Sequence, residues 1–229
     1  MITFKKESFI FPLGNMMFFI AGTIGIATKN GYSFGFAPWA QQEYFINPIP
    51  SREEKEYVPV EIPWGFNGFD IPDNSSIFGW MQSERYFAHC KDLIRHYFML
   101  KEITEPIKDT VFIHYRAYPV QVADIFVSLD GDYYAKALSL LPHKRVIVIS
   151  DDIRRAKNVI GGNYEYMNGT TQRDFYLLSH ADYVVMSNSS FSWWGAWMSG
   201  AQTVCPTQWF KPAIGQGLED VFCENWIRL

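Results

Sequence analysis

The sequence predicts an α/β fold in which parallel strands form sheets that are covered by helices on both faces. Short apolar runs alternate with segments of helical spacing through the second half of the chain, which is the pattern of repeated β-α-β units. Near the N-terminus, an apolar run, a Gly-containing turn and an apolar helix follow one another, as at the opening of such a unit. The chain has 229 residues, of which 48% are hydrophobic, so it can form one large domain or two small lobes.

The first half of the chain predicts few regular elements. Residues 38–73 contain many prolines, which predict irregular structure with short strands. Apolar spacing and turn residues predict the other elements of this half. These are a strand at 9–11, a turn at 12–15, a helix from there to Asn30 with Gly31 as its C-cap, a strand at 32–36 and a helix at 83–100.

The second half of the chain is regular. A segment at 102–109 is typical of a hinge, and it divides the chain into an N-terminal lobe (1–105) and a C-terminal lobe (106–229). The C-terminal lobe predicts alternating strands and helices. The strands are 110–114, 145–149, 183–186 and 203–204, and the helices are 132–141, 173–180 and 191–198.

Three polar clusters fall where predicted strands end, and this is the main reason to expect a site. They are His114-Tyr115-Arg116, Ser150-Asp151-Asp152 and Ser187-Asn188-Ser189-Ser190. In parallel α/β sheets, ligands bind outside the carboxyl ends of the strands. The pattern therefore predicts one ligand site formed by all three clusters.

The Ser-rich cluster and Arg116 each allow two interpretations. The Ser-rich segment can hold phosphate at a helix N-terminus, or one Ser can simply cap that helix. Arg116 can bind a diphosphate through two parallel hydrogen bonds, or form a surface ion pair.

The acidic residues allow further interpretations. Asp151 and Asp152 can hold a metal, act as a base, or cap a helix that starts near Ile153. Asp130-Gly131-Asp132 has the spacing of a manganese-binding DxD motif, but Gly beside Asp favours a loop and helix cap. Asp124 and Asp70 are candidates for a general base.

The charge distribution argues against a nucleic-acid partner. The formal net charge is −4, and there is no basic stripe. The dipeptide Arg154-Arg155 is too short to form one.

Cysteine usage and hydropathy argue against a zinc-binding, disulfide-stapled or membrane-spanning chain. The three cysteines are odd in number and widely spaced. The N-terminus is too short and too mixed for a signal peptide, and the apolar stretch 16–27 is shorter than the roughly 20 residues of a membrane span. We therefore expect a cytoplasmic protein without a transmembrane anchor.

Four segments together carry a family resemblance. They are Pro12-Leu13-Gly14-Asn15-Met16-Met17-Phe18, Gln82-Ser83-Glu84-Arg85-Tyr86-Phe87, Ser150-Asp151-Asp152 and Asn188-Ser189-Ser190-Phe191-Ser192-Trp193-Trp194-Gly195-Ala196-Trp197. In these segments the chain resembles the α-1,2-fucosyltransferase family, glycosyltransferase family 11. The segments follow the family order and span almost the whole chain, and the last of them is the most specific.

The resemblance implies a GT-B-like fold with two Rossmann-like lobes whose parallel sheets face a cleft. It implies an inverting, metal-independent transfer of a deoxy-sugar, most simply fucose from GDP-fucose, to a hydroxyl of a glycan acceptor. The N-terminal lobe would lie on the acceptor side, and the C-terminal lobe would bind the nucleotide-sugar donor. His114 and Arg116 are then the catalytic candidates. The donor-binding candidates are Gly14, Asn15, Asp151, Asn188, Ser189, Ser190, Phe191 and Ser192.

One motif departs from the family pattern. The family has His-x-Arg-Arg-Gly-Asp, whereas this chain has His114-Tyr115-Arg116-Ala117-Tyr118-Pro119. The alternatives are therefore another donor, such as an activated rhamnose, or a nucleotide- or glycan-binding protein without turnover. A Rossmann-type epimerase is not supported, because no G-x-G-x-x-G run follows a strand.

Overall fold

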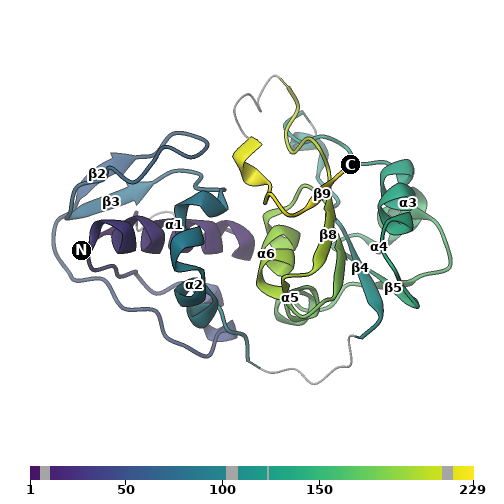
Figure 1. The fold of residues 1–229 in the computed structure, drawn as a ribbon, viewed down its shortest axis with the longest axis horizontal. Helices are drawn as coiled ribbons and strands as arrows, with labels where there is room; N and C mark the ends of the chain where they lie inside the picture. The colour runs from purple at the N-terminus through teal and green to yellow at the C-terminus, as the bar shows by residue number, and fades with distance from the viewer. Residues whose placement is uncertain (6–10, 102–107, 123, 213–218) are drawn as a thin grey trace. The chain divides into compact units, whose positions relative to one another are not determined.

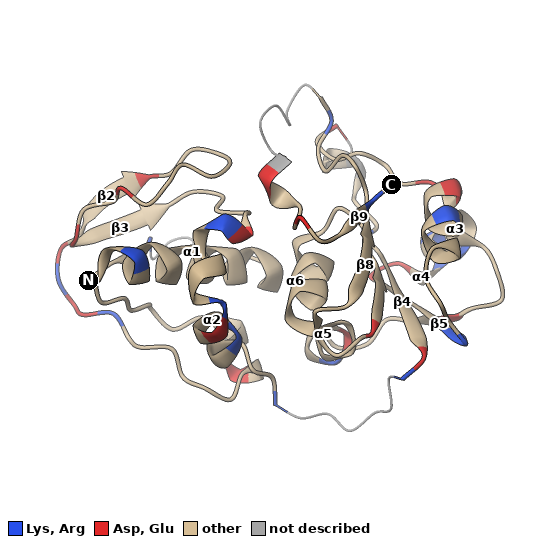
Figure 2. Cartoon of the chain, in the orientation of Figure 1, with Lys and Arg blue, Asp and Glu red and all other residues tan. Residues whose placement is uncertain are grey.

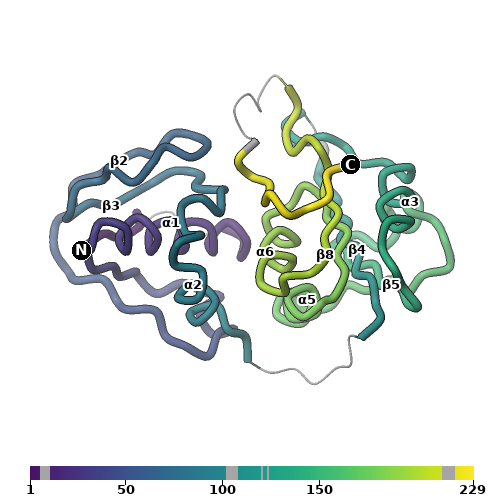
Figure 3. The backbone as a smooth tube through the Cα atoms, viewed as in Figure 1, coloured from purple at the N-terminus to yellow at the C-terminus, as the bar shows by residue number. Residues whose placement is uncertain are grey.

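The computed structural model describes residues 1–5, 11–101, 108–122, 124–212 and 219–229 (Figure 1). The chain forms two compact units: unit 1 is Met1–Glu102 with Gly217–Cys223, and unit 2 is Ile103–Gln216 with Glu224–Leu229. Both contain helices and a parallel sheet, which confirms the predicted fold class. The C-terminal part of the chain, yellow in Figure 3, contributes to both units.

Unit 2 has a six-stranded, fully parallel sheet among its described residues, with the strand order β6-β5-β4-β7-β8-β9. The chain therefore enters this sheet at its middle with β4, continues to one edge with β5 and β6, and returns to form the other half with β7, β8 and β9. This is the doubly wound order of dinucleotide-binding folds, and its topological switch point lies between β4 and β7. The strands are β4 (Thr110–Tyr115), β5 (Arg145–Ser150), β6 (Glu165–Met167), β7 (Tyr183–Val185), β8 (Gln202–Cys205) and β9 (Ile227–Arg228).

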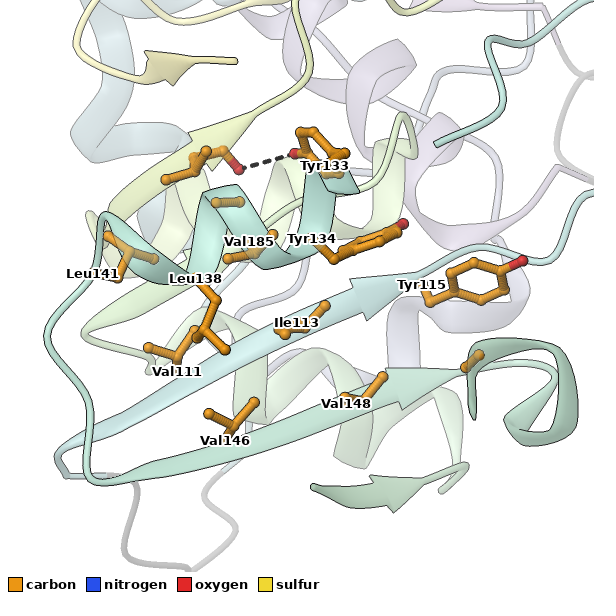
Figure 4. Close-up of a cluster of buried hydrophobic side chains, with 13 residues drawn as sticks. Val111, Ile113, Tyr115, Tyr133, Tyr134, Leu138, Leu141, Val146, Val148 and Val185 are labelled. Atoms are coloured by element: carbon orange, nitrogen blue, oxygen red, sulfur yellow. Dashed lines mark hydrogen bonds between the residues drawn. The ribbon is translucent and has the colours of Figure 1, made fainter. Parts of the chain in front are cut away.

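Helices cover both faces of this sheet. On one face, α3 lies over β4 and β5, and Ile113 and Val148 point towards it (Figure 4). On the other face, α5 and α6 pack so closely that a methyl group on Gly195 would lie 2.4 Å from Cβ of Leu178. The helices are α3 (Gly131–Ser139), α4 (Ile153–Ile160), α5 (Thr171–Ser179) and α6 (Ser190–Ser199), with a 3-10 turn, η5 (Val120–Val122).

Unit 1 is built around a smaller parallel sheet of order β1-β3-β2 and one long apolar helix, α1. The helix ends where Gly31 takes a left-handed conformation at φ 71°, which confirms the predicted C-cap. The elements are β1 (Thr3–Phe4), α1 (Leu13–Asn30), η2 (Ala40–Tyr44), β2 (Val58–Glu61), β3 (Ser75–Phe78), η3 (Glu84–Tyr86), η4 (Ala88–Cys90), α2 (Lys91–Tyr97) and η6 (Glu219–Val221).

Several predictions for unit 1 were wrong. The turn at 12–15 is the start of α1, because the carbonyl oxygen of Pro12, its N-cap residue, accepts from the N–H groups of Asn15 and Met16. Residues 32–36 form only isolated bridges. The predicted strand at 9–11 lies mostly outside the described residues, since 6–10 are not described.

The single helix predicted at 83–100 is divided into η3, η4 and α2. Tertiary contacts of Tyr86 explain the division. Its hydroxyl donates to the carbonyl oxygen of Gly65 at 2.9 Å and accepts from the N–H of Asn67 at 2.9 Å. Its carbonyl oxygen lies so close to α1 that a Cβ on Gly25 would be only 1.9 Å away. These contacts fix Tyr86 in a position that a continuous helix does not provide.

The predictions for unit 2 hold, with helix ends that differ by one or two residues. All the predicted strands and helices are present, and Asp130 and Asp152 cap α3 and α4 through their side chains. The sequence interpretation missed the two short edge strands, β6 and β9. Over the described parts of the chain, every helix is too short or too polar to cross a bilayer.

Candidate functional site

The three polar clusters converge at the carboxyl edge of the unit 2 sheet. They follow β5, β4 and β7, which are neighbours in that order. The clusters after β4 and β7 therefore flank the topological switch point, where doubly wound sheets bind their ligands. The site has two parts, a buried layer of His114, Ser187, Asn188 and Ser192, and an exposed rim of Arg116 and Asp151 with the backbone N–H of the half-buried Ala117.

His114 joins the two sides of the switch point. Its Nδ1 shares a hydrogen bond of 2.8 Å with Oγ of Ser187, which follows β7. Its ring lies 5.5 Å from the ring of Phe191 on α6. Burial lowers the pKa of His114 to about 3, and the nearby Arg116 guanidinium adds to this shift. The imidazole is therefore uncharged at neutral pH.

Asn188 and Ser192 complete the buried layer. The Asn188 amide nitrogen donates to the carbonyl oxygens of Val127 at 2.7 Å and Trp209 at 3.0 Å. The Ser192 hydroxyl bonds the carbonyl oxygens of Ser187 and Ser189. These side chains hold the loop before α6 in place, because their polar atoms bond protein groups.

The start of α6 is the more accessible part of this segment. Ser189 is the N-cap, and its hydroxyl accepts from the N–H of Phe191 at 3.4 Å. Ser190 and Phe191, in the first turn, are partly exposed. The positive end of the α6 dipole thus lies at the carboxyl end of β7.

The exposed rim is held together by Asp151. Its Oδ2 accepts from Nη1 of Arg116 in an ion pair, and its Oδ1 accepts from the N–H of Ala117 at 2.9 Å. Both charged side chains remain exposed, at 39% for Arg116 and 38% for Asp151. The ion pair that was one interpretation of Arg116 is present, and its exposure leaves the guanidinium accessible to an anion.

Tyr118 links the rim to the buried layer. Its hydroxyl donates to the carbonyl oxygen of Asn188 at 2.6 Å, and its ring stacks on Phe126 at 3.9 Å. The Arg116 guanidinium lies 5.7 Å from the centre of the Tyr118 ring. Burial raises the pKa of Tyr118 well above its usual value, so the phenol keeps its proton.

The acidic residues have mainly structural contacts. Asp152 accepts from the N–H of Arg155 at 2.9 Å and Asp130 from that of Tyr133 at 3.0 Å, so both are helix caps. Within the described residues, no group of three His, Cys, Asp or Glu is placed to hold a metal ion. Asp124 is exposed and faces Lys211 at 3.5 Å, while Asp70 is exposed in unit 1.

Gly14 and Asn15 lie in unit 1, in the first turn of α1. Oδ1 of Asn15 accepts from Nε2 of Gln82 at 3.2 Å, which joins two of the four segments that carry the family resemblance. Gly14 is buried and Asn15 is half-buried.

Sequence reasoning missed two residues of the site, Tyr118 and Arg155. Tyr118 could have been found, because it follows Arg116 by two positions. Arg155 belongs to a dipeptide that was too short to signal a basic stripe. Its Nη1 nevertheless donates to the carbonyl oxygen of Tyr118 at 3.0 Å.

A doubly wound parallel sheet with a phosphate-compatible edge at its switch point defines a class of nucleotide-binding α/β proteins. The family model "Glycosyl transferase family 11" matches residues 42–229. The chain therefore belongs to glycosyl transferase family 11.

The proteins similar to the chain include two curated relatives and a solved structure. The alpha-1,2-colitosyltransferase of Escherichia coli is 32% identical over 213 residues, which cover 80% of this chain and 73% of that protein. The O-antigen biosynthesis glycosyltransferase WbnK of Escherichia coli is 31% identical over 114 residues, which cover 44% of this chain and 37% of that protein.

The solved structure is a mutant of Arabidopsis thaliana FUT1 in complex with GDP. It aligns with a TM-score of 0.55 and 9% identity over 89% of this chain and 69% of that chain. At this identity the likeness concerns the fold alone, and it supports the GT-B-like α/β architecture.

Proposed function

We propose that the chain is an inverting glycosyltransferase that moves a deoxy-sugar from a GDP-linked donor to a hydroxyl of a glycan acceptor. Membership of family 11 and similarity to a colitosyltransferase support this proposal. Fucose and colitose differ by one hydroxyl group, so both donors present nearly the same shape to the protein. The GDP complex of the structurally similar FUT1 favours guanine as the base.

The observation that carries the proposal is the position of Arg116. It is an exposed guanidinium directly after β4, and the Tyr118–Asn188 hydrogen bond ties its segment to the loop before α6. A diphosphate at this edge would meet a cation that can form two parallel hydrogen bonds and the positive end of a helix dipole. Unit 2 would therefore bind the donor.

The proposed reaction is a direct displacement at the anomeric carbon. The acceptor oxygen attacks from the face opposite the nucleotide, and the bond between the anomeric carbon and the β-phosphate oxygen breaks. Arg116 and the N-terminus of α6 stabilise the negative charge that develops on the departing diphosphate. The proton of the acceptor hydroxyl passes to a carboxylate base, for which Asp124 and Asp70 are the candidates.

His114 has a positioning role in this proposal. It is neutral at the pH of the reaction and hydrogen-bonded to Ser187. Asn188 and Ser192 act in the same way, because their side chains bond the protein. Ser190 and Phe191, together with Asn15 and Gly14 of unit 1, remain proposed donor contacts.

The test is a transfer assay with the purified chain. GDP-fucose, GDP-colitose and a nucleotide-linked rhamnose are each incubated with glycan acceptors in the presence of EDTA, and sugar addition is followed by mass spectrometry. We expect transfer from a GDP-deoxy-sugar and about 100-fold slower turnover in Arg116→Ala.

Arg145→Ala is the matched control for that assay. Arg145 also forms an exposed ion pair, with Glu165, but it lies at the opposite end of the strands, so its loss should leave turnover unchanged. Absence of turnover with every donor would overturn the proposal, and nucleotide binding without turnover would favour a binding protein instead.

A further inference from the structure

Arg155 reaches the exposed rim from a neighbouring helix. It is the third residue of α4, which begins directly after Asp152 at the carboxyl end of β5. Its Nη1 donates to the carbonyl oxygen of Tyr118 at 3.0 Å. Tyr118 in turn follows Arg116 by two residues. The hydrogen bond therefore places the Arg155 guanidinium beside the segment that carries Arg116.

This position is electrostatically unfavourable for the folded protein alone. The N-terminus of a helix carries partial positive charge, so cations are disfavoured there. The first turn of α4 contains Arg154 and Arg155 and no acidic residue, although Asp152 caps it. Arg155 is exposed, and across the described residues it pairs with no carboxylate. A cation held here by a carbonyl group is explained more simply by an anionic ligand than by folding.

The charges at the rim lead to the same conclusion. Asp151 neutralises Arg116, and Asp152 adds a negative charge beside it. His114 contributes none, because its imidazole is neutral. These two carboxylates weaken the attraction of Arg116 and the α6 N-terminus for a diphosphate, and Arg155 adds a second guanidinium that can bind phosphate oxygens in the fork geometry that arginine favours.

We propose that Arg155 is a second donor-binding residue, whose guanidinium contacts the diphosphate of the nucleotide-sugar together with that of Arg116. In this chain Ala117 stands where the family motif has its second arginine. Arg155 would supply a second positive charge at this edge from α4 instead. This inference rests on the proposed function, since it requires that unit 2 binds a nucleoside diphosphate.

The experiment measures the binding of GDP and of guanosine to the full chain by calorimetry, directly and by competition. The variants are Arg155→Gln and Arg154→Gln. Gln is polar but uncharged, so the first variant removes the positive charge, and the guanosine measurement controls for the lost contact with the Tyr118 carbonyl. Arg154 is the matched control, because it is an exposed arginine on the same turn, about 100° around the helix.

We expect Arg155→Gln to weaken GDP binding about tenfold, the size expected for a charge-assisted contact, and to leave guanosine binding unchanged. Arg154→Gln should change GDP binding less than twofold. The melting temperature of Arg155→Gln should be equal to or above that of the wild type, since the helix dipole no longer opposes a cation.

Three results would overturn the inference while the proposed function stands. These are wild-type GDP affinity in Arg155→Gln, equal losses in both variants, and equal losses of GDP and guanosine binding. The second result would indicate an effect of net charge, and the third a change in loop shape. If the wild type binds no nucleoside diphosphate, the proposed function fails and this inference with it.

Discussion

The buried layer and the exposed rim are built from the same strand ends but differ in how exposed their hydrogen-bonded polar groups are. His114 and Asn188, in the buried layer, direct their hydrogen bonds at other protein groups. Arg116 and Asp151, each one residue beyond the end of its strand, bond each other at the surface. The buried layer therefore determines the shape of the site, whereas Arg116 in the exposed rim can exchange its bond with Asp151 for a bond with a ligand. Stability and donor binding should therefore respond to different mutations.

The largest expected effect on stability comes from Asn188→Ala. The change removes one buried and one partly buried hydrogen bond to main-chain carbonyl groups, and we expect the free energy of unfolding to fall by about 2–3 kcal/mol. Urea denaturation measures this. Arg116→Ala is the contrasting variant and should cost less than about 1 kcal/mol, because its ion pair is exposed. Similar losses of unfolding free energy in the two variants would contradict the distinction between the buried layer and the exposed rim.

The next effect is a pH dependence caused by His114. Its pKa is about 3 in the folded protein and near 6.5 in the unfolded chain, so the unfolded chain binds more protons below pH 6.5. Stability should therefore fall as the pH falls from about 6.5 towards 3, by about 1.4 kcal/mol per pH unit. Between pH 6.5 and 5 the loss is about 2 kcal/mol.

Urea denaturation of the wild type and of His114→Asn at both pH values isolates this contribution. The raised pKa of Asp174 acts in the opposite direction in both proteins and cancels in their difference. Equal pH dependence in the two proteins would show that His114 is protonated in the fold, and thus that the layer is open to water.

The smallest effect is expected for Tyr118→Phe, at the contact between the two regions. The variant keeps the ring stack on Phe126 and loses the hydroxyl bond to the Asn188 carbonyl, which should cost about 1 kcal/mol. The KM for the donor should rise a few-fold, because Arg116 loses part of its support. Tyr57→Phe, which loses an exposed bond to the Glu53 carbonyl and a weak one to the thioether of Met1, should change neither quantity appreciably. An unchanged KM in Tyr118→Phe would show that the bond between Tyr118 and the buried layer does not support donor binding at the rim.

The sequence predicted unit 2 well because its central strands are buried on both faces. Such strands are continuous apolar runs with polar residues at their ends, as 145–150 illustrates. The edge strands β6 and β9 were missed, since they are short and partly exposed. In unit 1 the contacts of Tyr86 with residues distant in sequence override the local helical spacing, so no local pattern could reveal them.

The same distinction applies to the candidate site. Arg116 and the Ser-rich loop were identified because they directly follow predicted strands. Arg155 was dismissed, since its importance depends on a carbonyl group 37 residues away. Acidic and basic residues are interspersed over the chain (Figure 2), so the charge pattern of the sequence did not point to Arg155.

The most direct test is an experimental structure of the chain with GDP bound. We expect the phosphate oxygens to lie within hydrogen-bonding distance of the Arg116 guanidinium and close to the first turn of α6. Phosphates bound at another edge of the unit 2 sheet, with the Arg116–Asp151 ion pair unchanged, would contradict this expectation.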